Sequence, residues 1–167
     1  RVQAVGSYSK NEMDGKLLYL YGWPDRETGL GMGASPAWYL GDRKQNALDL
    51  KANGPFTLFG RRHEAVVGAS FNRQKGDFNY RSAIDAADVG NFLNWNGSYP
   101  EPDWNDSIIA TRYTTTQTGW YGALRLNLAD PLKLIVGGRY STWKTNSIGF
   151  GGEGRTEFDK NAFTPYA

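Results

Sequence analysis

The sequence predicts an all-β protein, an antiparallel meander of about seven strands that forms an arc of a transmembrane β-barrel. Three observations predict this fold class. Apolar and polar residues alternate along several long segments, short turns alternate with long connections, and aromatic residues lie near the ends of the apolar faces. Residues 1–167 are expected to form one unit, a partial β-barrel domain.

The clearest hairpin spans residues 120–141, with a tight turn predicted at Ala129-Asp130-Pro131. In both segments the even-numbered positions are apolar and include an aromatic ring, whereas the odd-numbered positions are mostly polar. The odd positions include Arg125, Lys133 and Arg139, whose charges suit a wet lumen better than a dry core.

Two further hairpins are expected before it. Alternation over residues 48–53 leads into a predicted turn at Gly54–Gly60 and resumes over residues 63–72. A weaker hairpin at the start of the chain is expected to turn at Asn11–Gly15.

Long connections are predicted between the hairpins, and one of them is expected to hold a short helix. Ser82-Ala83-Ile84-Asp85 resembles a capping box ahead of the apolar stretch Ala86–Leu93. Short turns at one end and long loops at the other are typical of outer-membrane barrels. The predicted connections are Asp25–Pro36, Gly76–Asp106 and Thr145–Thr156.

Composition excludes several classes of function. There is no cysteine and only one histidine, His63, so a thiolate metal site is excluded and a zinc site or catalytic triad is not expected. The net charge of +2 with scattered basic residues gives no sign of nucleic-acid binding. No apolar run reaches the roughly 18 residues of a spanning helix. We therefore expect neither an enzyme nor a resident cofactor.

A soluble β-sandwich with ligand-binding aromatic loops is the alternative, because alternation suits it equally well. Strand length favours the barrel: the predicted strand Tyr113–Leu128 exceeds the usual length of about 5–6 residues in globular proteins. Phe71, Trp120 and Tyr140 at the ends of the apolar faces match the aromatic girdles of membrane barrels.

The stretch from Gly54-Pro55-Phe56 through Phe59-Gly60-Arg61 to His63-Glu64 resembles a barrel segment of TonB-dependent ferric-siderophore receptors of the ferripyoverdine type. Two more stretches agree, Asn94–Trp104 and Phe158–Tyr166. The resemblance covers about residues 45–167, and the first 40 residues match only in general character.

The resemblance implies a bacterial outer-membrane receptor that binds a ferric siderophore and imports it with energy from TonB. It implies a 22-stranded barrel with an N-terminal plug that contacts the TonB complex, and neither the plug nor the last strand is present in this sequence. Both ends of the chain are expected to lie inside a longer protein. The implied partners are ferric siderophore as the transported ligand, the TonB complex and outer-membrane lipid, with no nucleic acid.

Six residues are candidates for siderophore contact. Siderophores carry flat, polar and often aromatic groups that stack on Trp or Tyr, and an anionic chelate would attract a cation. The loop rings could equally pack the loops together, whereas Trp143 faces inward near the mouth, which favours a ligand contact. The candidates are Trp23, Trp95, Tyr99, Trp104, Arg139 and Trp143.

Four other features are expected to be structural. We interpret Phe56–Arg62 as a turn and His63 as a hydrogen-bonded interfacial residue, neither with a catalytic role. The aspartates between residues 77 and 106 lack the spacing of a calcium-binding loop. The run Gly149–Gly154 is a loop tip and not a phosphate loop, because it lacks the Lys-Ser/Thr ending.

Overall fold

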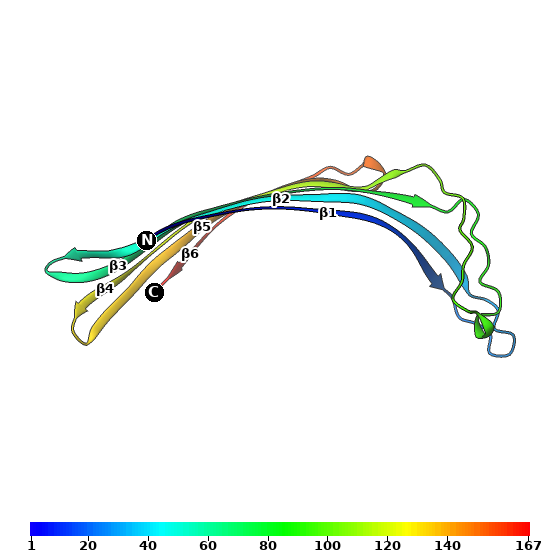
Figure 1. The fold of residues 1–167 in the computed structure, drawn as a ribbon, viewed down its shortest axis with the longest axis horizontal. Coiled ribbons are helices and arrows are strands. Elements are labelled where there is room, and N and C mark those ends of the chain that lie inside the picture. The colour runs from blue at the N-terminus through cyan, green and yellow to red at the C-terminus, as the bar shows by residue number, and fades with distance from the viewer.

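The computed structural model describes all of residues 1–167 as one antiparallel sheet in the order β1-β2-β3-β4-β5-β6, each strand paired with the next along the chain (Figure 1). The meander is confirmed, with six strands in place of about seven. The strands are β1 (Val2–Tyr21), β2 (Gly33–Leu58), β3 (Arg61–Ser82), β4 (Ile108–Ala129), β5 (Leu132–Ile148) and β6 (Thr156–Tyr166), with 3₁₀ turns η1 (Phe92–Asn94) and η2 (Phe150–Gly152).

The sheet has no second layer and almost no interior. Only 7 of 167 residues are buried, and apart from glycine and proline Ala37 is the only hydrophobic one among them. A sandwich encloses its core between two sheets about 10 Å apart. The single curved sheet in Figure 1 therefore does not support the sandwich alternative.

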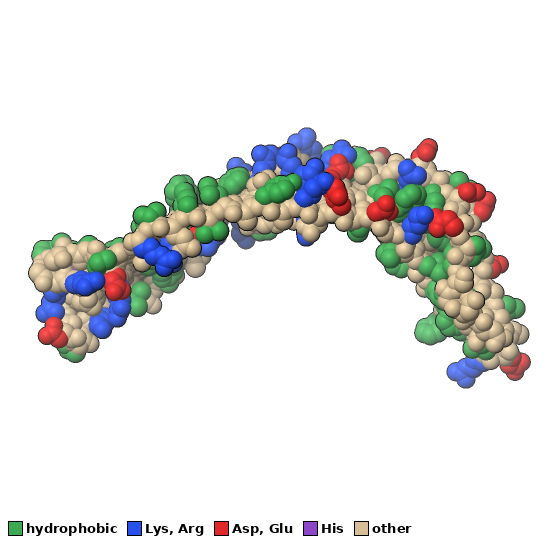
Figure 2. All heavy atoms as spheres, in the orientation of Figure 1, with side chains coloured by type: hydrophobic (Ala, Val, Ile, Leu, Met, Phe, Trp, Pro, Cys, Tyr) green, Lys and Arg blue, Asp and Glu red, His purple; other side chains and the backbone are tan.

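Strand register places most of the apolar side chains nearest the short turns on one face. One cross-strand row of this face illustrates the pattern, because it contains only apolar or aromatic residues. The row is Ala4, Leu50, Ala69, Trp120, Tyr140 and Phe163. We call this region the outer apolar band and its side of the sheet the outer face. Figure 2 shows hydrophobic side chains along the upper edge of the molecule on the side of the N-terminus.

The opposite, inner face carries the charges predicted for a wet lumen, including Asp49, Arg125 and Arg139. On the inner face, side chains of the neighbouring strand also lie close to several glycines. A Cβ built on Gly68 would lie 2.2 Å from the Tyr121 ring, because that ring covers the glycine. Cross-strand pairs of an aromatic ring and a glycine let the sheet curve toward this face.

The strands are far longer than a membrane requires. β2 has 26 residues, which corresponds to roughly 86 Å at about 3.3 Å per residue. About 9–11 tilted residues cross the hydrocarbon layer. The outer apolar band occupies only the part nearest the short turns, so the other half of each long strand extends past it toward the long loops (Figure 1).

The predicted turn at Asn11–Gly15 is wrong, which accounts for the lower strand count. β1 continues through these residues, and Asn11 to Gly15 pair with Arg43 to Tyr39 of β2. Asn, Asp and Gly favour turns, but here an unbroken backbone ladder with β2 outweighs that local preference.

The turn predicted at Gly54–Gly60 shrinks to Phe59 and Gly60. Both have positive φ, 51° and 74°, as a two-residue hairpin turn with matching strand twist requires. Gly54 and Pro55 remain in β2, paired with Ala65 and Glu64 of β3. A proline is tolerated there because β1 pairs only as far as Ala52, so Pro55 lies on a free edge of β2. The turn after Ala129 is confirmed, at Asp130 and Pro131.

The long connections are also shorter than predicted, and the helix over Ala86–Leu93 is absent. β3 continues to Ser82, and β5 to Ile148. Ser82 does not cap a helix, because its hydroxyl accepts a hydrogen bond from Asn105 at 3.0 Å. Only η1 is helical in this loop, and the Asn91 side chain caps it.

Candidate ligand-binding surface on the inner face

A hollow of about 570 Å³ crosses the inner face and is lined by residues from all six strands. It carries two cationic side chains, one carboxylate, several amides and hydroxyls, and two aromatic rings on its inner side. The lining includes Val5, Asp49, Ser70, Asn72, Gln117, Arg139, Ser141, Trp143, Phe158 and Lys160. Such a mixture of rings and convergent polar groups is typical of ligand sites.

Arg139 is positioned from β5 by its neighbours in the sheet. Its Nε donates a hydrogen bond to Ser141 Oγ at 2.9 Å, and the guanidinium lies over Gly119 of β4. A Cβ at Gly119 would lie 2.9 Å from Arg139 Nη2, so the glycine leaves the space that the guanidinium uses. Arg139 has no carboxylate partner within the chain, which leaves its charge available to an anionic ligand.

Trp143 lies two residues further along β5, on the same face. Its indole N–H donates to Thr145 Oγ1 at 2.8 Å, and Thr145 in turn is bonded to Thr115 of β4 at 3.1 Å. The side chain remains 44% exposed, so the ring is oriented but still open to solvent. Arg139 and Trp143 are thus the two candidates that the structure brings together in one hollow.

The three rings in the loop between β3 and β4 lie apart from this hollow. Trp95 donates to the Ser98 carbonyl at 2.6 Å and packs against Phe92. The Tyr99 hydroxyl donates to the Ala87 carbonyl at 2.7 Å, and burial raises the pKa of Tyr99. These contacts support the loop-packing interpretation.

Trp104 joins the same loop to the outer face of the sheet. It packs edge-on against Trp38 of β2 at 5.6 Å, and its N–H donates to Glu101 at 2.7 Å. Lys16 of β1 pairs with Glu101 at 2.5 Å and lies 4.6 Å from the centre of the Trp38 ring. Hydrogen bonds from Lys16 and Trp104 lower the pKa of Glu101. We call these four residues and Arg81, which covers Trp38, the loop clasp.

Trp23 differs from the other loop rings. It lies in the connection between β1 and β2 and is 91% exposed. Nearby, Asp25 organises the turn by accepting hydrogen bonds from the backbone N–H groups of Glu27 and Thr28 and from the Thr28 hydroxyl. Those bonds, led by the backbone bond from Thr28, lower the pKa of Asp25.

An aromatic cluster on the inner face was missed by sequence analysis. Phe78 and Tyr80 alternate along β3, in a segment predicted as loop. Phe78 stacks with Tyr113 at 6.4 Å, and Tyr80 packs on Tyr39 at 5.4 Å and on Phe150 at 5.8 Å. Aromatic residues at alternating positions after Gly76 were the signal that could have revealed this stretch as a strand.

His63 forms hydrogen bonds to the backbone of two neighbouring strands, as expected of a structural residue. His63 Nδ1 accepts from the Asn127 N–H at 3.1 Å, and Nε2 lies 3.1 Å from the Leu58 carbonyl, as a neutral ring protonated on Nε2 requires. The structure assembles no group of three or more His, Asp or Glu side chains able to hold a metal ion. None of its helices is long and apolar enough to cross a membrane.

The register, the outer apolar band and the charged inner face define an arc of a membrane-spanning β-barrel. Comparison with known proteins gives the same class. Residues 2–167 match the family model described as TonB dependent receptor-like, beta-barrel, so the chain belongs to this family of bacterial outer-membrane receptors.

Its relatives include two receptors from Pseudomonas. The chain is 31% identical over 173 residues to the ferric-pyoverdine BN7/BN8 receptor of Pseudomonas putida, covering 96% of this chain and 21% of that receptor. It is 37% identical over 114 residues to the ferripyoverdine receptor of Pseudomonas aeruginosa, covering 66% of this chain and 14% of that receptor.

Solved structures agree on the fold. The crystal structure of the Pseudomonas aeruginosa ferripyoverdine receptor bound to ferripyoverdine matches with a TM-score of 0.76 and 27% identity. That match covers 98% of this chain and 21% of the receptor chain. The chain thus spans about a fifth of the length of the structures it resembles.

Proposed function

We propose that residues 1–167 form one arc of the wall of an outer-membrane receptor that binds a ferric siderophore and imports it with energy from the TonB complex. The observation that carries the proposal is the inner-face hollow, in which Arg139 and Trp143 lie together with Lys160. The names of the relatives, ferric-pyoverdine receptors, support the ligand class. The proposal assigns transport and no reaction to this chain.

The chemistry of the hollow suits such a ligand. A ferric chelate presents flat aromatic groups and negative charge, and Trp143 supplies an exposed ring face, which Arg139 and Lys160 complement with two cations. Asp49 is the one carboxylate in the lining, so the cationic side chains exceed the acidic ones.

The partners of the complete protein follow from the same proposal. The outer apolar band faces outer-membrane lipid, and the edges of β1 and β6 pair with further strands of the barrel. The TonB complex and the plug would act from elsewhere in the receptor. Trp23 remains a candidate ligand contact in the loops, because its ring is exposed and makes no hydrogen bond in the structure.

The test is ligand binding by the intact receptor that carries this segment. We expect Trp143→Leu and Arg139→Gln each to weaken the binding of ferric pyoverdine about tenfold or more, because each removes a stacking or charged contact. Binding is measured by titration of the purified receptor in detergent. The matched control is Trp120→Leu, which removes an exposed ring from the outer face. Unchanged affinity in both inner-face variants would refute a ligand site in this hollow.

A further inference from the structure

Beyond the outer apolar band, the outer face of β3 becomes basic. Phe71 is the last apolar residue of the band on this strand, and the next two side chains on the same face are Arg73 and Lys75. Both are exposed. Figure 2 shows Lys and Arg side chains gathered past the hydrophobic edge, toward the middle of the molecule.

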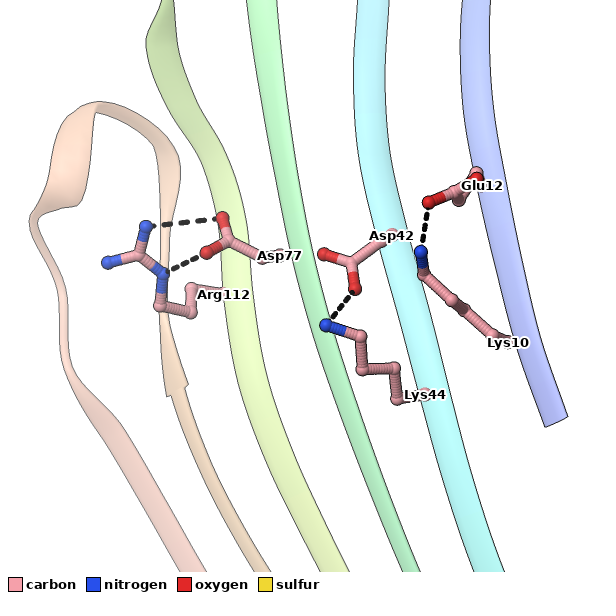
Figure 3. A network of polar contacts seen from close by, with 6 residues as sticks. All are labelled: Lys10, Glu12, Asp42, Lys44, Asp77 and Arg112. Carbon is pink, nitrogen blue, oxygen red and sulfur yellow. Dashed lines mark hydrogen bonds and ion pairs between the residues drawn. The ribbon is translucent and has the colours of Figure 1, made fainter. Parts of the chain in front are cut away.

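Three lysines are direct cross-strand neighbours in this region: Lys10 on β1, Lys44 on β2 and Lys75 on β3. Like charges directly opposite one another destabilise a sheet, so such a row needs compensation. Two of the three have it within the chain, because Lys10 pairs with Glu12 and Lys44 pairs with Asp42 at 3.0 Å (Figure 3).

Lys75, the third lysine of this row, has no acidic partner within the chain. Asp77, the acidic residue that stands next to Lys75 on the same face, is held by Arg112 of β4 through two hydrogen bonds of 2.8 and 3.2 Å (Figure 3). Neither Lys75 nor Arg73 forms an ion pair in the structure. Two adjacent cations on β3 are therefore left without a counter-charge from the protein.

Hydrogen-bond donors and a hollow lie beside these two cations. Thr116 is the cross-strand partner of Arg73, and Thr114 is that of Lys75. Both threonines line a hollow of about 430 Å³, whose lining on β5 and β6 also includes Lys144, Glu157 and Asp159. Lys144 pairs with Asp159 at 2.9 Å and Glu157 pairs with Arg155 at 2.7 Å, so Lys144 is not a free cation of this site. Their neighbours Thr115 and Thr118 are hydrogen-bonded to β5, whereas the hydroxyls of Thr114 and Thr116 make no hydrogen bond in the structure.

The depth of the site agrees with lipid headgroups. Arg73 and Lys75 lie two and four residues past Phe71, which for a tilted strand is about 5–10 Å beyond the apolar band. The headgroup layer on each side of the hydrocarbon core is of similar thickness, about 5–7 Å. The site is also on the side of the long loops, which face the outside of the cell in such barrels.

We propose that Arg73 and Lys75, with the hydroxyls of Thr114 and Thr116, bind the phosphate of a lipid headgroup in the outer leaflet. Guanidinium, ammonium and hydroxyl donors at neighbouring positions of one exposed face suit the oxygens of a phosphate. This inference rests on the proposed function in one respect, that the outer apolar band is embedded in lipid.

The probe is phosphatidic acid, whose headgroup is a bare phosphate, offered to the intact receptor in detergent alongside phosphatidylcholine. Retained lipid is counted by native mass spectrometry. We expect the wild-type receptor to retain phosphatidic acid preferentially, and the double variant Arg73→Gln/Lys75→Gln to retain it roughly 30-fold less. Thr116→Val, which removes only a hydroxyl, is expected to reduce retention by a smaller factor.

The matched control is Lys51→Gln/Lys133→Gln, which removes the same charge from the inner face at two lysines without ion pairs. We expect this control to retain phosphatidic acid as the wild type does. Equal loss in both double variants, or no preference for phosphatidic acid in the wild type, overturns the headgroup site. Ferric pyoverdine binding is measured on the same samples, so its absence with phosphatidic acid retention intact counts against the proposed function alone.

Discussion

His63 shows how one side chain can join three strands at the short-turn end. Its ring is 5% exposed, bonds the backbone of β2 and β4 from β3, and packs on Phe56 at 5.2 Å. The Asn127 N–H that it satisfies lies just past Glu64 and Arg125, the last pair of β3 and β4, so the ring bond links these two strands beyond the end of their backbone ladder. Its role is structural, as the sequence predicted.

We expect His63→Ala to destabilise the complete barrel by about 1–3 kcal/mol, because the substitution leaves two partly buried backbone groups without their partner and removes the packing on Phe56. The free energy of unfolding is measured by urea titration of the receptor in detergent. Arg62→Ala, at the neighbouring exposed side chain, is the control and should change it by about 0.5 kcal/mol or less. Equal effects of the two variants would show that the ring bonds contribute nothing.

Gly119 gives a test of how Arg139 is positioned. Alanine there would bring a Cβ within 2.9 Å of the guanidinium and 2.8 Å of Ser70 Oγ. We expect Gly119→Ala to turn Arg139 away and to weaken siderophore binding about tenfold, with little effect on folding. Gly15→Ala is the control on the same face, since nothing lies within 4 Å of its Cβ position. Unaltered affinity in Gly119→Ala would mean that the position of Arg139 does not matter for the ligand.

The sequence predicts which face of the sheet a residue lies on better than it predicts which residues of other strands lie next to it. Alternation alone placed Arg139 and Trp143 on the inner face, because side-chain direction in a strand follows position with a period of two. It could not show that Asp49, Asn72 and Lys160 meet them, because cross-strand register depends on pairing across the whole sheet. The contacts of Trp104 with Trp38 and Lys16 could not be predicted from the sequence for the same reason.

At the scale of the element, the loop clasp fixes the long loop between β3 and β4 to the outer face. Its ion pair depends on ionised Glu101, whose pKa is lowered by hydrogen bonds from Lys16 and Trp104. A carboxyl group with a lowered pKa in the folded state contributes stability above its ordinary pKa. That contribution is lost as the pH falls through the lowered value.

We therefore expect the loop to stay attached at neutral pH and to detach in acid, below the ordinary pKa range of a glutamate. Hydrogen–deuterium exchange of residues 84–107 in the intact receptor measures this. Glu101→Gln should raise exchange in the loop already at neutral pH, because it removes the charge that Lys16 pairs with. Asp103→Asn is the matched control, since the Asp103 side chain makes no hydrogen bond or ion pair in the structure and only its carbonyl bonds Ile84. Equal exchange in the two variants contradicts the clasp.

Element boundaries were predicted poorly wherever a strand continues beyond the membrane. The outer face then carries charged residues, as at Lys10 and Glu12, and the segment no longer resembles a strand with one apolar side. The sequence therefore predicts a turn at residues 11–15 and a loop at residues 76–82, where the structure has strands β1 and β3. Within the outer apolar band, where apolar and polar residues mostly alternate, the prediction from Leu132 to Tyr140 is confirmed.

At the scale of the whole molecule, the sheet needs contacts with other molecules or other strands to be stable. A soluble domain of this length buries most of the surface that its unfolded chain exposes, yet only 7 of these 167 residues are buried. Backbone hydrogen bonds within the sheet, 93 of the 103 in total, hold the strands together, but they leave both faces and two edges open. Under the proposed function, lipid covers the outer apolar band and neighbouring strands of the barrel pair with β1 and β6.

The isolated chain should therefore not exist as a folded monomer in water. We expect residues 1–167, refolded alone in buffer, to associate through the edges of β1 and β6 and through exposed rings such as Trp120 and Phe163, which are both 65% exposed. Sedimentation velocity then shows large species in buffer. In detergent the apolar faces are covered and only edge pairing remains, so the species should become smaller without becoming uniform. A uniform monomer in buffer that unfolds cooperatively would contradict this and would require a core that the single sheet does not contain.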